Sequence, residues 1–142
     1  MIISFAWTTP ALLAGAKTMT RREWSATHAR RFTVGMLVDA WDRSPRTRKG
    51  RKVATIRITR PPHLEWSSDL SEEDVDREGF NWLRAHGEWV QVEQILSAWR
   101  AERRFIWVVE FELVERVSSA SPAAPPASGE GLHFDNGIRN AS

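Results

Sequence analysis

The sequence predicts an α+β fold in which a small mixed β-barrel carries short flanking helices. Segments with strand character lie near both ends of the folded part of the chain, and amphipathic helices lie between them. The chain lacks the regular alternation of strands and helices that predicts a parallel α/β sheet. A hydrophobic fraction of 42% over 142 residues is enough to bury one core.

Composition divides the chain into two parts. Residues 1–117 hold the periodic apolar patterns and form the predicted domain. Residues 118–142 are rich in Ser, Ala, Pro and Gly and carry almost no periodic apolar pattern. Such a segment buries too little surface to offset the entropy of ordering, so we expect a disordered tail.

The first predicted elements flank a basic segment. Ile2–Trp7 has the pattern of a strand, and TTPALLAG that of a helix with a threonine cap, an early Pro10 and Gly15 at its end. Thr18–Arg22 then has the character of an edge strand. SATHARRF then has the pattern of a short helical or turn segment, and another strand is predicted over Leu37–Asp42.

The next strand follows a basic hairpin, RSPRTRKGRK. Val53–Thr59 alternates apolar and polar residues, which predicts one face in the core and one toward solvent or a ligand. The residues predicted to face the core are Ala54, Ile56 and Ile58.

Helices and a long strand are predicted in the second half of the domain. Ser71 begins a capping pattern, and a helix from this cap places Val75, Trp82 and Leu83 on one face. Glu88–Arg103 predicts another helix. RFIWVVEFELVERV is the longest strand candidate, and one of its faces carries Phe105, Trp107, Val109, Phe111 and Leu113.

Charge is distributed unevenly along the chain. Residues 1–60 carry thirteen Lys/Arg and three Asp/Glu, whereas residues 61–117 carry six and thirteen. A basic half favours an anionic partner, most simply the phosphate of a nucleotide or nucleic acid. The alternative is that the two halves neutralise each other across the fold.

Several classes of site are excluded or disfavoured. Cysteine is absent and the four histidines are scattered, which excludes disulfides and thiolate metal sites and argues against zinc. We therefore expect no metal and no cofactor. No apolar run approaches the length of a membrane helix, and the N-terminus lacks a signal-peptide pattern, so we expect a cytoplasmic protein without a membrane partner.

Glu78 is a candidate buried carboxylate. It lies on the flank of the apolar stripe of its predicted helix and is therefore aimed toward the body of the domain. Gly79 follows it, although glycine inside a helix costs about 1 kcal/mol relative to alanine, so we expect a close approach there or the end of the helix. An inward-facing lysine would be the natural partner of Glu78, and an ordinary surface pair with an arginine of its own helix is the alternative.

Lys17 and Thr20 lie in the segment AGAKTMTRR and are candidates for catalysis. A lysine in a desolvated pocket has a lowered pKa and can take a proton from a nearby hydroxyl, which makes threonine a usable nucleophile. Residues three apart on an ideal strand face opposite sides, so this chemistry requires a turn or bulge between them. The alternative is that Lys17 binds an anion.

A basic belt with interleaved tryptophans surrounds this segment. Arginines beside indoles suit phosphate contact combined with base stacking, which is worth roughly 1 to 3 kcal/mol per base. The alternative for any one tryptophan is core packing. The belt consists of Arg21, Arg22, Arg30 and Arg31, with Trp7, Trp24 and Trp41.

The motif resembles that of a known family. Gly15, Lys17 and Arg22 reproduce the Gly-x-Lys-x-x-x-x-Arg pattern of the ASCH domains, a branch of the PUA-like β-barrel superfamily linked with RNA. Four stretches resemble landmarks of that family, in order, over essentially residues 2–115: SFAWTTPALLAGAKTMTRREW, VGMLVDAW, LSEEDVDREGF and WVVEFELV. The resemblance implies a PUA-like barrel in a family that includes RNA-binding modules, a ribonuclease and small bacterial amidohydrolases.

Those amidohydrolases remove the acetyl group from the exocyclic N4 of acetylated cytidine. Their Gly-x-Lys-Thr-x-Thr segment is matched by Gly15, Lys17, Thr18 and Thr20, and their glutamate after a Leu-Thr/Ser-Glu start is matched by Glu78. By this resemblance Thr20 would attack the acetyl carbonyl, Lys17 would accept its proton, and Glu78 would hold or relay charge. The sequence does not identify the oxyanion donors that acyl transfer requires.

The expected partner is thus a modified nucleoside, best N4-acetylcytidine, or single-stranded RNA. A noncatalytic RNA-binding module and a ribonuclease are the alternative functions. Relative to the smallest amidohydrolases the chain adds a basic hairpin, Arg46–Lys52, and the segment Trp82–Arg103, which could reshape or cover the pocket. The residues assigned to substrate or RNA binding are Gly15, Thr18, Arg21, Arg22, Trp24 and Arg57.

Overall fold

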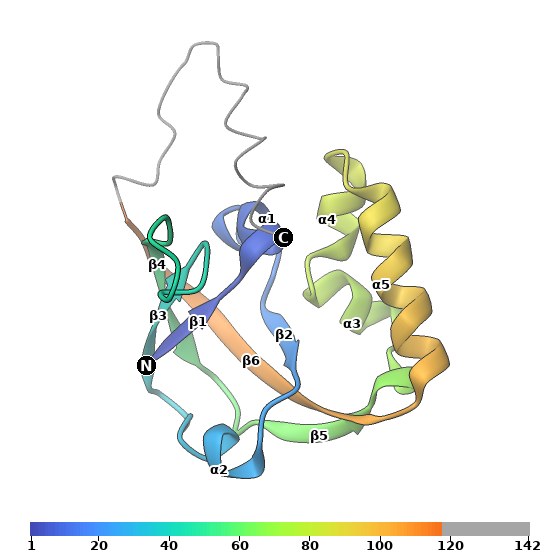
Figure 1. Cartoon of the computed structure of the whole chain (residues 1–142), viewed down its shortest axis with the longest axis horizontal. Helices are drawn as coiled ribbons and strands as arrows, with labels where there is room; N and C mark the ends of the chain where they lie inside the picture. The colour runs from blue at the N-terminus through green and yellow to red at the C-terminus, as the bar shows by residue number, and fades with distance from the viewer. Residues whose placement is uncertain (118–142) are drawn as a thin grey trace.

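The structure, a computed structural model, describes residues 1–117 as a mixed α+β fold whose sheet curls into a partial barrel (Figure 1). The predicted class is therefore confirmed at this level. The predicted tail, residues 118–142, lies outside the described residues. The strands are β1 (Ile2–Ser4), β2 (Met19–Arg22), β3 (Leu37–Trp41), β4 (Lys52–Ile58), β5 (His63–Trp66) and β6 (Phe105–Arg116).

The sheet is built around the long strand β6. β2 pairs antiparallel with residues 107–110 of β6 and ends the sheet, as predicted for an edge strand. On the opposite edge of β6, β4 pairs with residues 111–116 and β5 with residues 105–108. β3 and then β1 continue the sheet beyond β4, and β1 runs parallel to β3.

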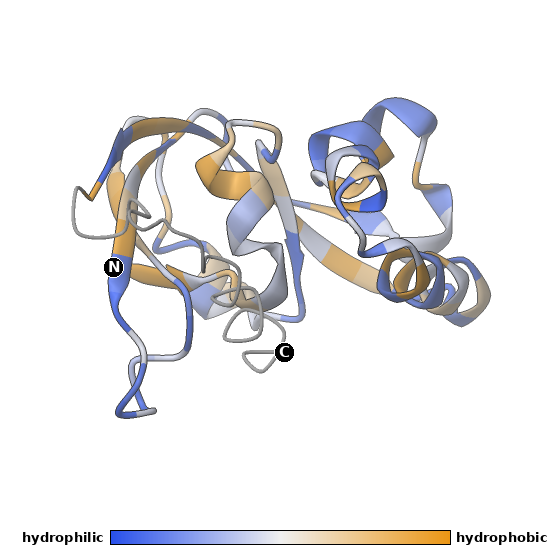
Figure 2. Ribbon diagram, turned by 90° about the horizontal axis from the view of Figure 1, so that it is seen from above, coloured by the Kyte–Doolittle hydropathy of each residue, from blue (hydrophilic) through white to orange (hydrophobic). Residues whose placement is uncertain are grey.

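Most of the helical residues gather on one side of β2 and β6. Seen from above, α3, α4 and α5 form a lobe beside the curled sheet (Figure 2). Within residues 1–117, no helix combines the length and the apolar character needed to cross a membrane. The helices are α1 (Thr9–Leu13), α2 (Ala26–Ala29), α3 (Glu72–Arg77), α4 (Phe80–Ala85) and α5 (Trp89–Glu102), with 3-10 turns at Ala6–Thr8 and Ser67–Asp69.

The buried apolar residues form two clusters that follow this division. The first lies within the curled sheet and includes the predicted core residues Ala54, Ile56 and Ile58, so the alternation predicted for β4 is confirmed. The second joins α1 to the helical lobe, which ties the N-terminal helix to elements far away in sequence. Its members are Ala11, Leu70, Val75, Phe80, Leu83, Val92 and Leu96.

The structure differs from the sequence predictions at several elements. The first strand ends at Ser4 rather than Trp7, because a 3-10 turn follows it. β5 was not predicted. The apolar face predicted for β6 is present in part: Val109, Phe111 and Leu113 pack in the first cluster, but Phe105 is 57% exposed. Ile106 and Val108 on the other face are also buried, because β6 is covered on both faces there.

Gly79 forms the corner between α3 and α4. The helix predicted from Ser71 ends at Arg77, and Gly79 adopts the left-handed conformation with φ +85°. A Cβ at this position would lie 2.8 Å from the Cβ of Ala11 and 3.0 Å from the Cβ of Lys17. The sequence predicted either the end of a helix at Gly79 or a close approach of another segment to it. Both are present, because α3 ends here and Ala11 and Lys17 lie against Gly79.

We predict that Gly79→Ala destabilises the protein by about 2 kcal/mol or more, because the added methyl combines left-handed strain with overpacking. Gly15→Ala is the matched control, since Gly15 has φ +79° but nothing within 4 Å of its Cβ position. Urea unfolding followed by circular dichroism measures both. An equal loss of unfolding free energy in the two variants would show that the contact of Gly79 with Ala11 and Lys17 does not constrain the corner.

Candidate functional site

β2 and the residues before it present two sets of polar side chains on opposite faces. Side chains alternate along an extended strand, so Lys17 and Arg21 share one face while Thr20 and Arg22 share the other. The contacts agree with this division. Lys17 and Arg21 both bind Glu78, whereas Arg22 binds Thr20.

Glu78 is held between two cations in the interior. Lys17 Nζ donates hydrogen bonds of 2.9 Å to Glu78 Oε1 and to the Glu78 backbone oxygen, and Arg21 Nη1 donates one of 2.6 Å to Oε2. The side chains of Lys17, Glu78 and Arg21 are only 3%, 2% and 1% exposed. The inward-facing lysine expected for Glu78 is therefore present, and Arg21 is a second partner that the sequence did not reveal.

Arg21 extends this ion-pair network toward β5. Its Nη2 donates to Asp74 Oδ2 at 3.0 Å and to Glu65 Oε1 at 3.2 Å. The other oxygen of Glu65 lies 2.8 Å from His63 Nε2. Arg21 is thus enclosed by carboxylates. Its guanidinium, which the sequence analysis assigned to substrate or RNA binding, is therefore already paired within the protein.

Burial and neighbouring charges shift the pKa values of the three cations. Burial lowers the pKa of Lys17 below 10.5, although Glu78 opposes the shift. Burial also acts to lower the pKa of Arg21, but Glu78 and Asp74 outweigh it and the pKa is raised. Burial lowers the pKa of Arg22 to about 10. Of these groups Lys17 is the one in which loss of a proton is chemically accessible.

Thr20 and Arg22 form the opposite face. Thr20 is buried, and its Oγ1 accepts a 3.2 Å hydrogen bond from Arg22 Nε, while Arg22 Nη2 donates to the Ser4 backbone oxygen at 2.6 Å. Within the described part of the chain, no hydrogen bond joins Thr20 to Lys17 or Glu78. The obstacle expected from the spacing of Lys17 and Thr20 is thus visible in the structure.

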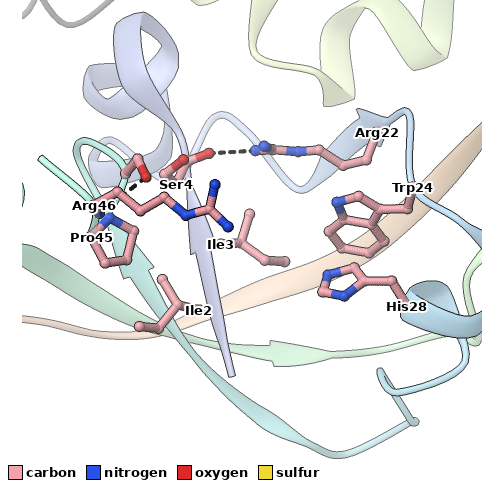
Figure 3. Close-up of a pocket in the computed structure, with 9 residues that line it drawn as sticks. Ile2, Ile3, Ser4, Arg22, Trp24, His28, Pro45 and Arg46 are labelled. Atoms are coloured by element: carbon pink, nitrogen blue, oxygen red, sulfur yellow. Dashed lines mark hydrogen bonds between the residues drawn. The ribbon is translucent and has the colours of Figure 1, made fainter.

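Arg22 also lines a cleft of about 360 Å³ (Figure 3). Trp24 forms part of its wall, stacked on Phe32 at 4.6 Å between ring centroids and meeting the His28 ring edge-on at 4.7 Å. The residues that line the cleft are Ile2, Ile3, Ser4, Arg22, Trp24, His28, Ser44, Pro45 and Arg46.

Three other predicted binding residues have different surroundings. Thr18 links the start of β2 to α3 through two hydrogen bonds. Its Oγ1 accepts one of 3.1 Å from Arg77 Nε, and its backbone N–H donates one of 2.8 Å to the Arg77 backbone oxygen. Gly15 supplies a left-handed turn after α1. Arg57 pairs with Glu112 on the exposed surface of the sheet, so the structure does not bring it into this site.

Sequence reasoning did not identify Asp74, Glu65 or Arg46 as individual site residues. Arg46 lies in the basic hairpin that the chain adds relative to the smallest amidohydrolases. Nothing in the sequence of this hairpin distinguishes Arg46 from the neighbouring cations. Among residues 1–117, no group of three His, Cys, Asp or Glu residues could hold a metal ion.

Comparisons with known proteins bear on the fold. No family model matches the sequence, and no curated protein matches it either. The chain is similar to the crystal structure of protein EF3133 from Enterococcus faecalis V583, of the family DUF984, with 18% sequence identity and a TM-score of 0.50. The match covers 77% of this chain and 71% of that chain. At this identity the likeness shows a shared fold alone.

We predict that Glu78→Gln destabilises the protein by about 3 to 5 kcal/mol, because it leaves Lys17 and Arg21 buried without their shared counter-charge. Glu112→Gln removes the same charge from the exposed pair with Arg57 and is expected to cost about 1 kcal/mol or less. The free energy of unfolding in urea measures both effects. Similar losses in the two variants would contradict a structural role specific to the buried ion-pair network.

Proposed function

We propose that this chain is an ASCH-type protein with a PUA-like barrel that hydrolyses the acetyl amide of N4-acetylcytidine. The partial barrel supports the fold assignment. The observation that carries the function is the buried ion pair between Lys17 and Glu78. Lys17 belongs to the same segment as the buried Thr20. Lys17, Thr20 and Glu78 are the residues that the resemblance implies for this chemistry.

In the proposed reaction Thr20 Oγ1 attacks the acetyl carbonyl carbon, and its proton passes to the Nζ of a neutral Lys17. The carbon–nitrogen bond then breaks, N4 takes up the proton, and cytidine leaves. Water hydrolyses the acetyl ester on Thr20, which releases acetate and restores the hydroxyl. No metal or redox partner is needed for this balance.

The surroundings of each group suit its proposed role. Burial lowers the pKa of Lys17 and so raises the fraction of neutral amine that can accept a proton. The Arg22 Nε–H that donates to Thr20 Oγ1 would stabilise negative charge on that oxygen. The proposal requires Lys17 Nζ to approach Thr20 in the substrate complex, where catalytic hydrogen bonds often first tighten.

A noncatalytic RNA-binding module is the second candidate. Lys17 and Arg21 are buried against carboxylates, and Arg57 pairs with Glu112, so these cations are not available to phosphate. Arg22, by contrast, lines the cleft. RNA binding would therefore depend on the cleft rather than on the buried ion-pair network.

We predict that the purified protein releases cytidine from N4-acetylcytidine, detected by liquid chromatography. Thr20→Val should abolish turnover because it replaces the hydroxyl with a methyl group of similar size, and Lys17→Met should lower kcat by about 100-fold or more. Thr20→Ser should retain part of the activity. Thr59→Val alters an exposed threonine and serves as the control.

Circular dichroism must first show that every variant is folded. Absence of turnover by the unmutated protein, together with tight and salt-sensitive binding to single-stranded RNA, would replace the hydrolase with the RNA-binding module.

A further inference from the structure

The cleft beside Thr20 carries two guanidinium groups and no carboxylate. Arg22 enters it from β2 and Arg46 from the loop between β3 and β4, and none of its nine lining residues is Asp or Glu. In Figure 3 the Arg46 side chain reaches toward Ser4 and Ile3 from one side, and Arg22 enters from the other. Two like charges that share a cleft whose lining holds no carboxylate favour an anionic ligand.

Arg22 differs from its neighbour Arg21 in how its charge is balanced. Arg21 meets the carboxylates of Glu78, Asp74 and Glu65. Within residues 1–117 Arg22 forms no salt bridge, although the charge of Glu78 acts on it, and its hydrogen bonds go to the uncharged oxygens of Thr20 and Ser4. A half-buried guanidinium held in place by neutral acceptors retains its full charge for a ligand, and its fork of donors matches phosphate geometry.

Arg46 is the complementary cation. It is exposed, and no ion pair involving its side chain is present among the described residues. Its backbone N–H donates to Ser44 Oγ at 3.2 Å, which helps to set the loop at the rim of the cleft. An anion between the two arginines would interact favourably with both charges at once.

The other walls and the size of the cleft indicate what carries the anion. Trp24 and His28 supply aromatic surface, and Ile2 and Ile3 supply apolar surface. A volume of about 360 Å³ is in the range of small-ligand sites. Because Arg22 Nε also binds Thr20 Oγ1, an anion on the guanidinium would lie one side chain away from the proposed nucleophile.

We propose that this cleft binds the phosphate of a cytidine nucleotide, so that the preferred substrate is phosphorylated cytidine rather than the free nucleoside. The identity of the base rests on the proposed function, whereas the capture of phosphate by Arg22 and Arg46 does not. The phosphate belongs either to a mononucleotide or to an RNA strand, and the two sources share the same chemistry.

Calorimetric titration of the full chain with cytidine, cytidine monophosphate and a short single-stranded oligocytidine tests the proposal. We expect the monophosphate or the oligonucleotide to bind about 10-fold or more tightly than cytidine, since charge-assisted hydrogen bonds from arginine to phosphate are stronger than neutral ones. Arg46→Ala should remove this preference. Arg48→Ala is the matched control, because Arg48 is exposed in the same loop, removes the same charge and does not line the cleft.

The comparison between ligands identifies the source of the phosphate. A monophosphate that binds as well as the oligonucleotide indicates a mononucleotide substrate, and a much tighter oligonucleotide indicates RNA. Equal affinity for cytidine and both phosphorylated ligands would overturn the proposal, as would equal losses in Arg46→Ala and Arg48→Ala. Because these ligands carry no acetyl group, a failure to hydrolyse N4-acetylcytidine is a separate result that leaves this test intact.

Discussion

The ion pairs that hold Glu78 between Lys17 and Arg21 are the interaction on which the rest of the structure depends. Burying ionised groups costs several kcal/mol per ion, and only close geometry and additional hydrogen bonds offset that cost. Here both carboxylate oxygens and the Glu78 backbone oxygen accept from cations. The corner at Gly79 must therefore lie against Lys17, which fixes the helical lobe relative to β2.

This constraint also shapes the opposite face of β2. Because Lys17 and Arg21 are committed to carboxylates, the alternation of the strand leaves Thr20 and Arg22 as the polar pair directed away from the buried ion-pair network. Arg22 is fixed by Thr20 and Ser4, and its charge remains available in the cleft. One short strand thus presents Lys17 and Arg21 to the buried ion-pair network and Thr20 and Arg22 to its opposite face.

Helical periodicity was enough to predict an inward Glu78, and the need of a buried carboxylate for a cation favoured a lysine partner over a surface pair with an arginine. The cost of a mid-helix glycine predicted either a close approach or a helix end at Gly79. The partners of Arg21 were not predictable, because Asp74 and Glu65 come from α3 and β5, which are distant in sequence. β5 itself is a four-residue segment that becomes a strand only by pairing with β6. Nor could sequence distinguish Arg46 from the other cations of its loop, since only the folded loop places it in the cleft.

The central claim, that Thr20 is the nucleophile and that the buried Lys17 takes its proton, is tested most directly by trapping the covalent intermediate. The protein would be mixed with N4-acetylcytidine, quenched rapidly in acid, digested and analysed by mass spectrometry. We predict one acetyl group on Thr20 during turnover, formed more slowly when Lys17 is replaced by Met. Release of cytidine by the unmutated protein with no acetyl group on Thr20 at any quench time would contradict it.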